Sequence, residues 1–311
     1  MLCKELLKEY LLDLKLRNYS KRTIETYEQQ VTKFLEFYSK TFNEDAHVQK
    51  VKKLHYKMFI GSLLDRNLME TYINAILKGN KSFYSYAVEE GLIRESPLKD
   101  IKFLKEQKKV LVAFSDNEVL NMINVWNFSS FLNARNKVII ATLLDTGIRV
   151  SELINLKNED IKSNYISVLG KGNKWRVVPL SNELEYLINK YIRIRDNHFK
   201  KLRTYYGRNR VLEDYLFLGK SGKGIKTVTN IELVIKDTAK KANVRPDVRA
   251  SPHTFRHYYS LKNLQQGQDI FTISKILGHN NINTTKIYLG SITNEQVIEK
   301  AVATSPLSCL L

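Results

Sequence analysis

The sequence predicts a mostly α-helical protein with one small antiparallel β-sheet, divided into two domains. Apolar residues recur at helical spacing through most of residues 1–109. In the second half, two short segments of strand-forming residues flank a glycine turn, which is the pattern of a β-hairpin. A lysine-rich run separates the halves and predicts an exposed linker, with a solvated helix end as the local alternative. We therefore predict a helical domain at residues 1–105, a linker at 106–112 and an α+β domain at 113–311.

The first half is predicted to form helices throughout. The first helix has apolar residues at helical spacing, namely Leu6, Tyr10, Leu11 and Leu14. Ser20 is placed to cap a second helix, whose apolar positions recur through residues 24–38. Shorter helices are predicted at residues 59–64, 68–77 and 83–88. Gly91 is expected to end the last of them, and Pro97 prevents its continuation.

The second half is predicted to mix helices with a hairpin. Ser115 and Glu118 have the spacing of a capping box at a helix start. Residues 133–144 form an apolar segment that predicts a helix. Residues 165–169 and 175–179 are predicted to pair as strands around the turn Gly170-Lys171-Gly172-Asn173.

The net charge of +18 indicates a polyanionic partner, because phosphates neutralised by a protein release their condensed counterions. The alternative is a soluble basic protein with no specific partner. Residues 1–110 carry +6 and the remainder +12, which suggests a clamp around DNA rather than one binding face. Residues 193–210 hold seven basic residues and one acid, Asp196, and predict a solvated helix and loop.

Composition excludes several classes of protein. Hydrophobic residues make up 43% of the chain, yet no apolar run approaches the roughly 20 residues that span a bilayer. Charged residues from Lys4 onward exclude a signal peptide. Cys3 and Cys309, the only cysteines, make neither a disulfide framework nor a zinc site. We expect a cytoplasmic protein with no membrane partner.

Two stretches of the second half carry an arginine or a lysine suited to binding phosphate. Gly147 would end one helix, and Arg149 and Glu152 would share a face of the next. The glycine-flanked turn could carry Lys171 to a phosphate. Each has an ordinary alternative, which is a surface ion pair for the first stretch and a polar hairpin for the second.

A third stretch places His253 and Arg256 at a helix start. Ser251 suits the N-cap and Pro252 the first helical position, so both side chains would lie where a helix favours an anion. The alternative is a solvated histidine and arginine.

In the fourth stretch, Gly278 would end a helix before His279, and Tyr288 would project from a second short helix. Taken alone, one tyrosine among 17 is expected to serve packing. The four stretches become informative when they are taken together and in order.

The ordered set resembles the signature of the tyrosine recombinases, also called the phage integrase family. Its members here are Arg149, Lys171, His253, Arg256, His279 and Tyr288. The stretches TGIRVSEL, GKGNK, HTFRH and LGHNNINTTKIY carry the match. Residues 18–38, which include SKRTIETY, and residues 83–93, FYSYAVEEGLI, resemble the family's SAM-like core-binding domain. No further domain precedes it, so we expect the simple Xer-like arrangement of a core-binding and a catalytic domain.

The resemblance implies a site-specific recombinase that cleaves and rejoins DNA through a 3′-phosphotyrosine, in integration, excision, resolution or transposition. The implied partners are a double-stranded recombination site and further copies of the chain, as a dimer on each site and a tetramer in the synapse, or a related recombinase. One ester exchanges for another, so no cofactor, metal or ATP is expected.

The family's chemistry assigns a role to each residue. Arg149, Arg256 and His279 would stabilise the charge that develops on phosphate, because guanidinium groups pair with phosphate oxygens. By the same resemblance, Glu152 would orient Arg149 or a histidine.

Proton transfers account for the remaining residues. Tyr288 would be the nucleophile, and a phenol with a pKa near 10 is only about 0.1% ionised at pH 7. His253 would therefore accept its proton. Lys171 would protonate the 5′-oxygen that leaves.

Two other functions remain open at this point. A type IB topoisomerase-like enzyme would share the chemistry but relax DNA as a monomer, and a non-catalytic DNA-binding protein would keep only the fold. A C-terminal helix is predicted near residues 293–303, docked either on a neighbouring protomer or on its own domain.

Overall fold

The computed structural model describes residues 1–106, 112–170, 174–206, 212–279 and 302. The chain divides into two compact units, Met1–Val110 and Leu111–Leu311, which we call the N-terminal and C-terminal units. Most of the predicted linker lies outside the described residues, so the bounds of the predicted domains stay predictions. The predicted C-terminal helix also lies outside them, apart from Val302.

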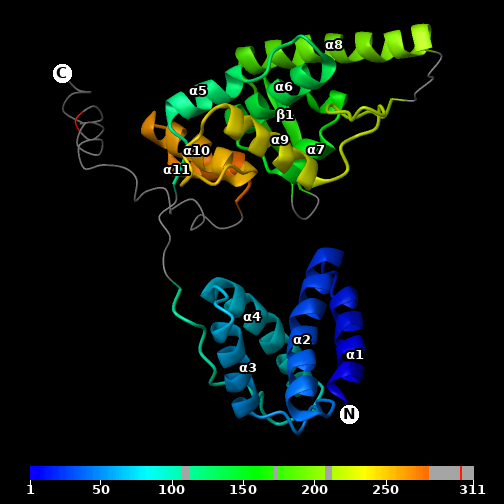
Figure 1. The fold of residues 1–311 in the computed structure, drawn as a ribbon, viewed down its shortest axis with the longest axis vertical. Helices are drawn as coiled ribbons and strands as arrows, with labels where there is room; N and C mark the ends of the chain where they lie inside the picture. Colours follow the sequence, from blue (N-terminus) through cyan, green and yellow to red (C-terminus); the bar gives the residue numbers. More distant parts are fainter. Residues whose placement is uncertain (107–111, 171–173, 207–211, 280–301, 303–311) are drawn as a thin grey trace. The chain divides into compact units, whose positions relative to one another are not determined.

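The N-terminal unit is helical, as predicted (Figure 1). Its helices are α1 (Cys3–Leu16), α2 (Lys21–Phe42), α3 (Lys53–Asp65) and α4 (Glu70–Glu89). Helix α2 packs against each of the other three. The predicted cap is confirmed, because the Ser20 hydroxyl accepts the Thr23 backbone N–H at 3.2 Å.

Helix α4 corrects the prediction of two separate helices at residues 68–77 and 83–88. The structure has one continuous helix through the intervening Gly79 and Asn80. Asn80 is buried, and its amide donates to the Gln30 and Ile76 carbonyls while its oxygen accepts the Tyr56 hydroxyl. Any Cβ at Gly79 would lie 2.1 Å from the side chain of Gln30 on α2. The glycine therefore permits close packing of α4 on α2 rather than a chain break.

The C-terminal unit mixes helices with a hairpin, and the predicted fold class is confirmed. Its helices are α5 (Asp116–Asn124), α6 (Phe131–Thr146), α7 (Val150–Asn155), α8 (Asn182–Tyr206), α9 (Val228–Lys241), α10 (Pro252–Gln265) and α11 (Ile270–Leu277), with a 3₁₀ turn η1 (Asn158–Asp160). The predicted capping box is present at α5, where Glu118 accepts the Ser115 N–H at 2.7 Å.

The hairpin has the predicted bounds. Strands β1 (Tyr165–Leu169) and β2 (Trp175–Pro179) pair antiparallel, with Leu169 opposite Trp175 next to the turn. In the part of the chain that the structure describes, these strands make up the whole sheet.

Helix α6 forms the centre of the C-terminal unit. Val138, Ile139, Ile140 and Leu143 are fully buried, and the helix contacts α5, α7, α8, α9 and α10. Figure 1 shows the long α8 lying along α6. Helix α11 contacts both α10 and β2. These contacts place α6 and α11 against α10, with the hairpin against α11.

The basic segment at residues 193–210 is only partly as predicted. Its described part belongs to α8, but Arg195 is buried rather than solvated. The Arg195 guanidinium donates to the Leu216 carbonyl at 3.0 Å and the Asn158 side chain at 2.9 Å. Among the helices described, none combines the length and apolar character needed to cross a membrane.

Candidate active site

Two helix ends form the base of the candidate site, and each ends on a glycine as predicted. Helix α6 ends at Gly147 with φ +58°, and α11 ends at Gly278 with φ +65°. A Cβ at Gly147 would lie 2.8 Å from the Tyr259 ring, and one at Gly278 would lie 3.0 Å from the Arg176 side chain. Both positions need glycine for its backbone conformation and for space.

Arg256 joins these two helix ends. It lies on α10, whose start is built as predicted, with the Ser251 hydroxyl accepting the Thr254 N–H. Its side chain is buried, and it donates to the Gly147 carbonyl at 2.8 Å and the Leu277 carbonyl at 2.6 Å. The partial negative charge at helix C-termini stabilises the guanidinium there.

Arg149 lies at the N-cap of α7, immediately after the end of α6. Its guanidinium donates to Glu152 Oε1 at 2.9 Å and to the Gly278 carbonyl at 2.8 Å. Its backbone N–H donates to Glu152 Oε2 at 2.7 Å. The side chain remains 32% exposed, so Arg149 is held in place at the surface of the unit.

Glu152 is buried between two arginines. Arg176 on β2 donates to Glu152 Oε1 at 2.7 Å and Oε2 at 2.8 Å, in addition to the bonds from Arg149. Burial would raise the pKa of Glu152, but the hydrogen bonds from Arg176 and Arg149 outweigh it and hold that pKa below its usual value. The predicted orienting role of Glu152 toward Arg149 has a direct geometric basis.

Arg176 is not among the site residues that the sequence motifs predict. A usable signal existed, since residues alternate between faces of a strand and Arg176 shares the inward face with the buried Val178. A charged side chain on a buried face needs a partner, and the resemblance assigns Glu152 to Arg149 or a histidine rather than to Arg176.

Three histidines lie in this basic environment, and each has a lowered pKa. Burial, followed by the charges of Arg256 and Arg149, lowers the pKa of His279 to about 4. The same causes in the same order lower the pKa of His253. Burial, then His253 and Arg256, lowers the pKa of His257, which was not among the predicted site residues. Neutral imidazoles can accept a proton at pH 7.

Lys171 and Tyr288 lie outside the described residues. The base of the Lys171 turn is described, and its Gly170 N–H donates to the Lys174 carbonyl at 2.9 Å. A Cβ at Gly170 would lie 3.2 Å from the Arg176 guanidinium. The structure thus brings Arg149, Glu152 and Arg256 together at the backbone that precedes His279. His253 is close enough for the charges of Arg256 and Arg149 to lower its pKa.

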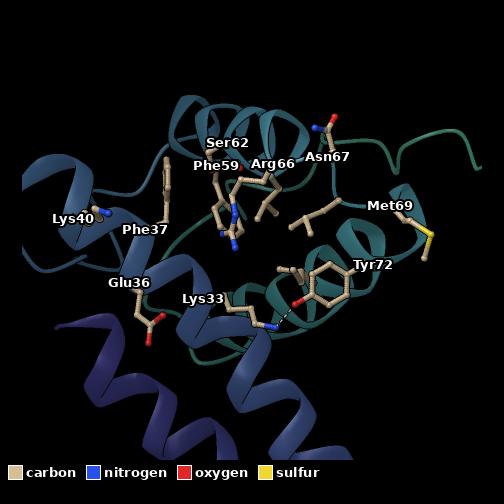
Figure 2. A pocket seen from close by; sticks show the side chains of 13 residues that line it. Lys33, Glu36, Phe37, Lys40, Phe59, Ser62, Arg66, Asn67, Met69 and Tyr72 are labelled. Carbon is tan, nitrogen blue, oxygen red and sulfur yellow. Dashed lines mark hydrogen bonds between the residues drawn. The ribbon is translucent and has the colours of Figure 1, made fainter.

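A cavity of about 790 Å³ lies elsewhere, in the N-terminal unit. Side chains from α2, α3 and α4 line it, and the Lys33 ammonium donates to the Tyr72 hydroxyl across one side (Figure 2). Its lining contains none of the predicted site residues, so the candidate site rests on the arginine cluster instead.

Known proteins resemble both units. The phage integrase family matches residues 102–295, and the N-terminal SAM-like domain of phage integrases matches residues 6–93. The chain is 30% identical over 290 residues to a tyrosine recombinase of Thermosipho africanus, covering 92% of this chain and 93% of that protein. It is 30% identical over 306 residues to tyrosine recombinase XerD of Rickettsia bellii, covering 94% and 95% of the two chains.

A solved structure shares the fold. The XerH site-specific recombinase, bound to a palindromic difH substrate in a post-cleavage complex, superposes with a TM-score of 0.71 at 22% identity, over 93% of this chain and 81% of that chain. The two family matches and the two close relatives confirm the resemblance seen in the motifs. The chain belongs to the phage integrase family of tyrosine recombinases.

Proposed function

We propose that this chain, as a site-specific DNA recombinase, cleaves and rejoins DNA strands through a covalent 3′-phosphotyrosine at Tyr288. The observation that carries the proposal is the arginine cluster, in which Arg149 and Arg256 are both anchored on the carbonyls that end α11. The chain runs from that end through His279 and reaches Tyr288 nine positions later.

The positive charge of the arginine cluster matches the negative charge of the phosphodiester and its transition state. A phosphodiester is anionic, and its transition state spreads further charge over the oxygens, so positive donors work best when they are already in place. Arg256 is fixed by two carbonyls and Arg149 by a carboxylate and a carbonyl, which limits their reorganisation on binding. His279, neutral at pH 7, would add a hydrogen bond to the same oxygens.

His253 would take the proton of Tyr288. Burial and the neighbouring Arg256 and Arg149 lower its pKa, which keeps the imidazole unprotonated near pH 7. The same two arginines would favour the phenolate over the phenol, because an opposite charge nearby stabilises an anion. The attacking oxygen therefore loses its proton to a base that is ready to accept it.

Lys171 would donate a proton to the leaving 5′-oxygen. An alkoxide is a much poorer leaving group than a phenolate, so protonation matters most on this side of the phosphorus. The reverse reaction, attack by a 5′-hydroxyl of the partner strand on the phosphotyrosine, exchanges the ester again. Because one ester replaces another, the scheme calls for no ATP and no metal ion.

The partners would be a double-stranded recombination site and further copies of the chain. The net charge of +18 suits a phosphate backbone. The similar XerH was solved on a palindromic substrate, and a palindrome offers matching halves to two protomers related by a two-fold axis. We propose a dimer on each site, a tetramer when two sites synapse, and a location in the cytoplasm.

Tyr288→Phe tests the nucleophile. The variant should bind its DNA site as the wild type does but form no covalent adduct on a nicked suicide substrate, because the phenyl ring has no oxygen to attack phosphorus. Denaturing gels measure the adduct. Tyr186→Phe, which changes an exposed tyrosine on α8, is the matched control and should retain it.

An adduct that persists in Tyr288→Phe would reject Tyr288 as the nucleophile. Relaxation of supercoiled DNA by the wild type without strand exchange between two duplexes would favour a type IB topoisomerase-like activity. DNA binding with no adduct in the wild type would favour a non-catalytic binding protein.

Lys171→Ala tests the general acid. Cleavage should slow by on the order of 1,000-fold, within the usual range for positioned proton transfer. A bridging 5′-phosphorothiolate should restore it, because the leaving sulfur needs no proton. Lys174→Ala removes a lysine from the same turn and should gain nothing from the sulfur substitution. If sulfur fails to rescue Lys171→Ala, the lysine positions phosphate instead.

A further inference from the structure

We propose that Arg176 is a positioning residue for strand cleavage, which holds three catalytic segments in register. These segments are the start of α7 with Arg149, the end of α11 before His279, and the hairpin that carries Lys171. The inference rests on the proposed function of the site and adds to it a residue outside the motif set.

The strongest observation is at the end of α11, where three consecutive carbonyls each accept a hydrogen bond from a different arginine. Arg176 Nε donates to the Ile276 carbonyl at 2.7 Å, Arg256 to the Leu277 carbonyl at 2.6 Å, and Arg149 to the Gly278 carbonyl at 2.8 Å. The last carbonyls of a helix have no intrahelical donor, so these contacts fix how the helix ends. Arg176 thus belongs to the same anchoring set as the two predicted catalytic arginines.

Glu152 links Arg176 to Arg149 a second time. Its Oε1 accepts from both guanidinium groups, at 2.7 Å and 2.9 Å, and its Oε2 accepts from Arg176 and from the Arg149 backbone. The paired bonds from Arg176 to the two carboxylate oxygens fix the plane of the carboxylate. A fixed carboxylate in turn fixes the direction in which Arg149 presents its charge.

Charge balance points the same way. Arg149 with Glu152 alone would be a neutral ion pair, whose attraction for phosphate is weak. Arg176 supplies the second positive charge, so the three side chains together carry +1. Arg176 therefore keeps Arg149 available to an anion while Glu152 holds it.

The hairpin is the third segment. Arg176 lies on β2 opposite Val168, and its guanidinium is close to Gly170, where the Lys171 turn begins. The side chain is only 13% exposed, and its described bonds go to Glu152 and the Ile276 carbonyl. Arg176 therefore acts through neighbouring residues rather than on DNA.

The first test is the rate of single-turnover cleavage of a nicked suicide substrate at saturating protein. Arg176→Met should slow cleavage by on the order of 100-fold, as small misplacements of catalytic groups do, with little change in DNA affinity. Arg176→Lys keeps the charge but loses the paired bonds, and it should slow cleavage by about tenfold. It also serves as the informative variant if Arg176→Met does not fold.

Arg195→Met is the matched control. Arg195 is another buried arginine of the C-terminal unit and donates to the Tyr215 and Leu216 carbonyls, away from the motif residues. Its loss should destabilise the unit while leaving the cleavage rate per folded molecule unchanged. Equal behaviour of the Arg176 and Arg195 variants would mean that Arg176 is merely structural, which would overturn the proposal.

The pH profile gives a readout that a general loss of stability would not move. Without Arg176, burial should raise the pKa of Glu152, so cleavage should fall at the acid end of the profile while the wild type still holds its rate. The charged and titratable groups of the surrounding elements, Arg149, Arg256 and His279, stay present in both proteins. Adding Glu152→Gln to Arg176→Met should remove this extra acid dependence.

The positioning role would be rejected if Arg176→Met cleaved as fast as the wild type and its cleavage rate depended on pH in the same way. Failure of the proposed function would look different, since the wild type itself would then form no adduct that depends on Tyr288.

Discussion

The two units differ in the kind of polar side chain that they bury. Among the residues described, the buried polar side chains of the N-terminal unit are two neutral amides, Asn74 and Asn80. The C-terminal unit also buries charged side chains, namely Glu118, Glu152, Asp160, Arg195 and Arg256. Burying a charge costs free energy unless close partners offset it, so this contrast needs a reason.

In the N-terminal unit, the buried Asn80 is satisfied by neutral groups alone. Asn80 joins α4 to Tyr56 on α3 and to a carbonyl of α2, within a core where Phe34 and Tyr56 stack 3.9 Å apart. Such contacts specify how the helices pack, and they do not depend on a charge that pH could remove.

The C-terminal unit pairs each of its buried arginines with backbone carbonyls. Arg195 does so within the fold, and Arg256 does so at the ends of α6 and α11. An arginine bonded to backbone carbonyls thus stabilises the fold at Arg195 and builds the candidate site at Arg256. The contrast teaches that this unit tolerates buried charge where carbonyls or ion pairs offset it, and that at the candidate site the same compensation fixes positive charge in place.

Arg256→Met should show the contrast most strongly. Cleavage should fall by on the order of 1,000-fold, because a prepositioned donor to the transition state is lost. Asn80→Ala in the N-terminal unit should cost about 1–3 kcal/mol of folding free energy but leave the cleavage rate of the bound, folded protein unchanged. Single-turnover cleavage and urea unfolding measure the two effects, and a comparable fall in cleavage for Asn80→Ala would break the distinction.

Replacing one glycine at a helix C-terminus in each unit gives a smaller effect. Gly91 (φ +70°) and Gly278 (φ +65°) share a left-handed backbone, so alanine at either should cost about 1–2 kcal/mol of stability. A Cβ at Gly91 would have no neighbour within 4 Å, whereas one at Gly278 would lie 3.0 Å from the Arg176 side chain. We expect Gly278→Ala alone to slow cleavage, by about tenfold. Equal cleavage rates for the two variants would mean that the end of α11 does not contribute to catalysis.

The smallest effect on cleavage is expected at Glu118, which should alter only the stability of the fold in acid. Hydrogen bonds from Arg245, opposed by burial, lower the pKa of Glu118 from 4.5 to about 2. A lowered pKa stabilises the fold above the unfolded value, so this contribution should be complete above about pH 4.5 and lost as the pH falls toward 2. Urea unfolding of Glu118→Gln across that range should show a flatter pH dependence than the wild type. An unchanged slope would mean that the Glu118–Arg245 pair contributes nothing to acid stability.

Several features were predictable because their causes are local. The Ser20 and Ser251 caps, the Ser115–Glu118 capping box and the glycine ends of α6 and α11 each depend on residues within four positions of one another. The strand bounds followed from strand-forming residues on either side of a glycine turn. The predictions failed where distant packing decided, as at Gly79 of α4, which packs against Gln30 of α2, and at the buried Arg195.

By itself, the sequence determined the family, the order of the motif residues and the helix ends at Gly147, Ser251 and Gly278, since these are properties of short stretches. Only the tertiary structure decided how these stretches work together. The bonds from Arg149 to Gly278 and from Arg176 to Ile276 cross 129 and 100 positions of the chain. The reason is physical: the carbonyls at the end of α11 have no intrahelical donor and accept the donors that the fold brings to them. Spacing along the chain does not reveal that Arg149, Arg256 and Arg176 would share these carbonyls.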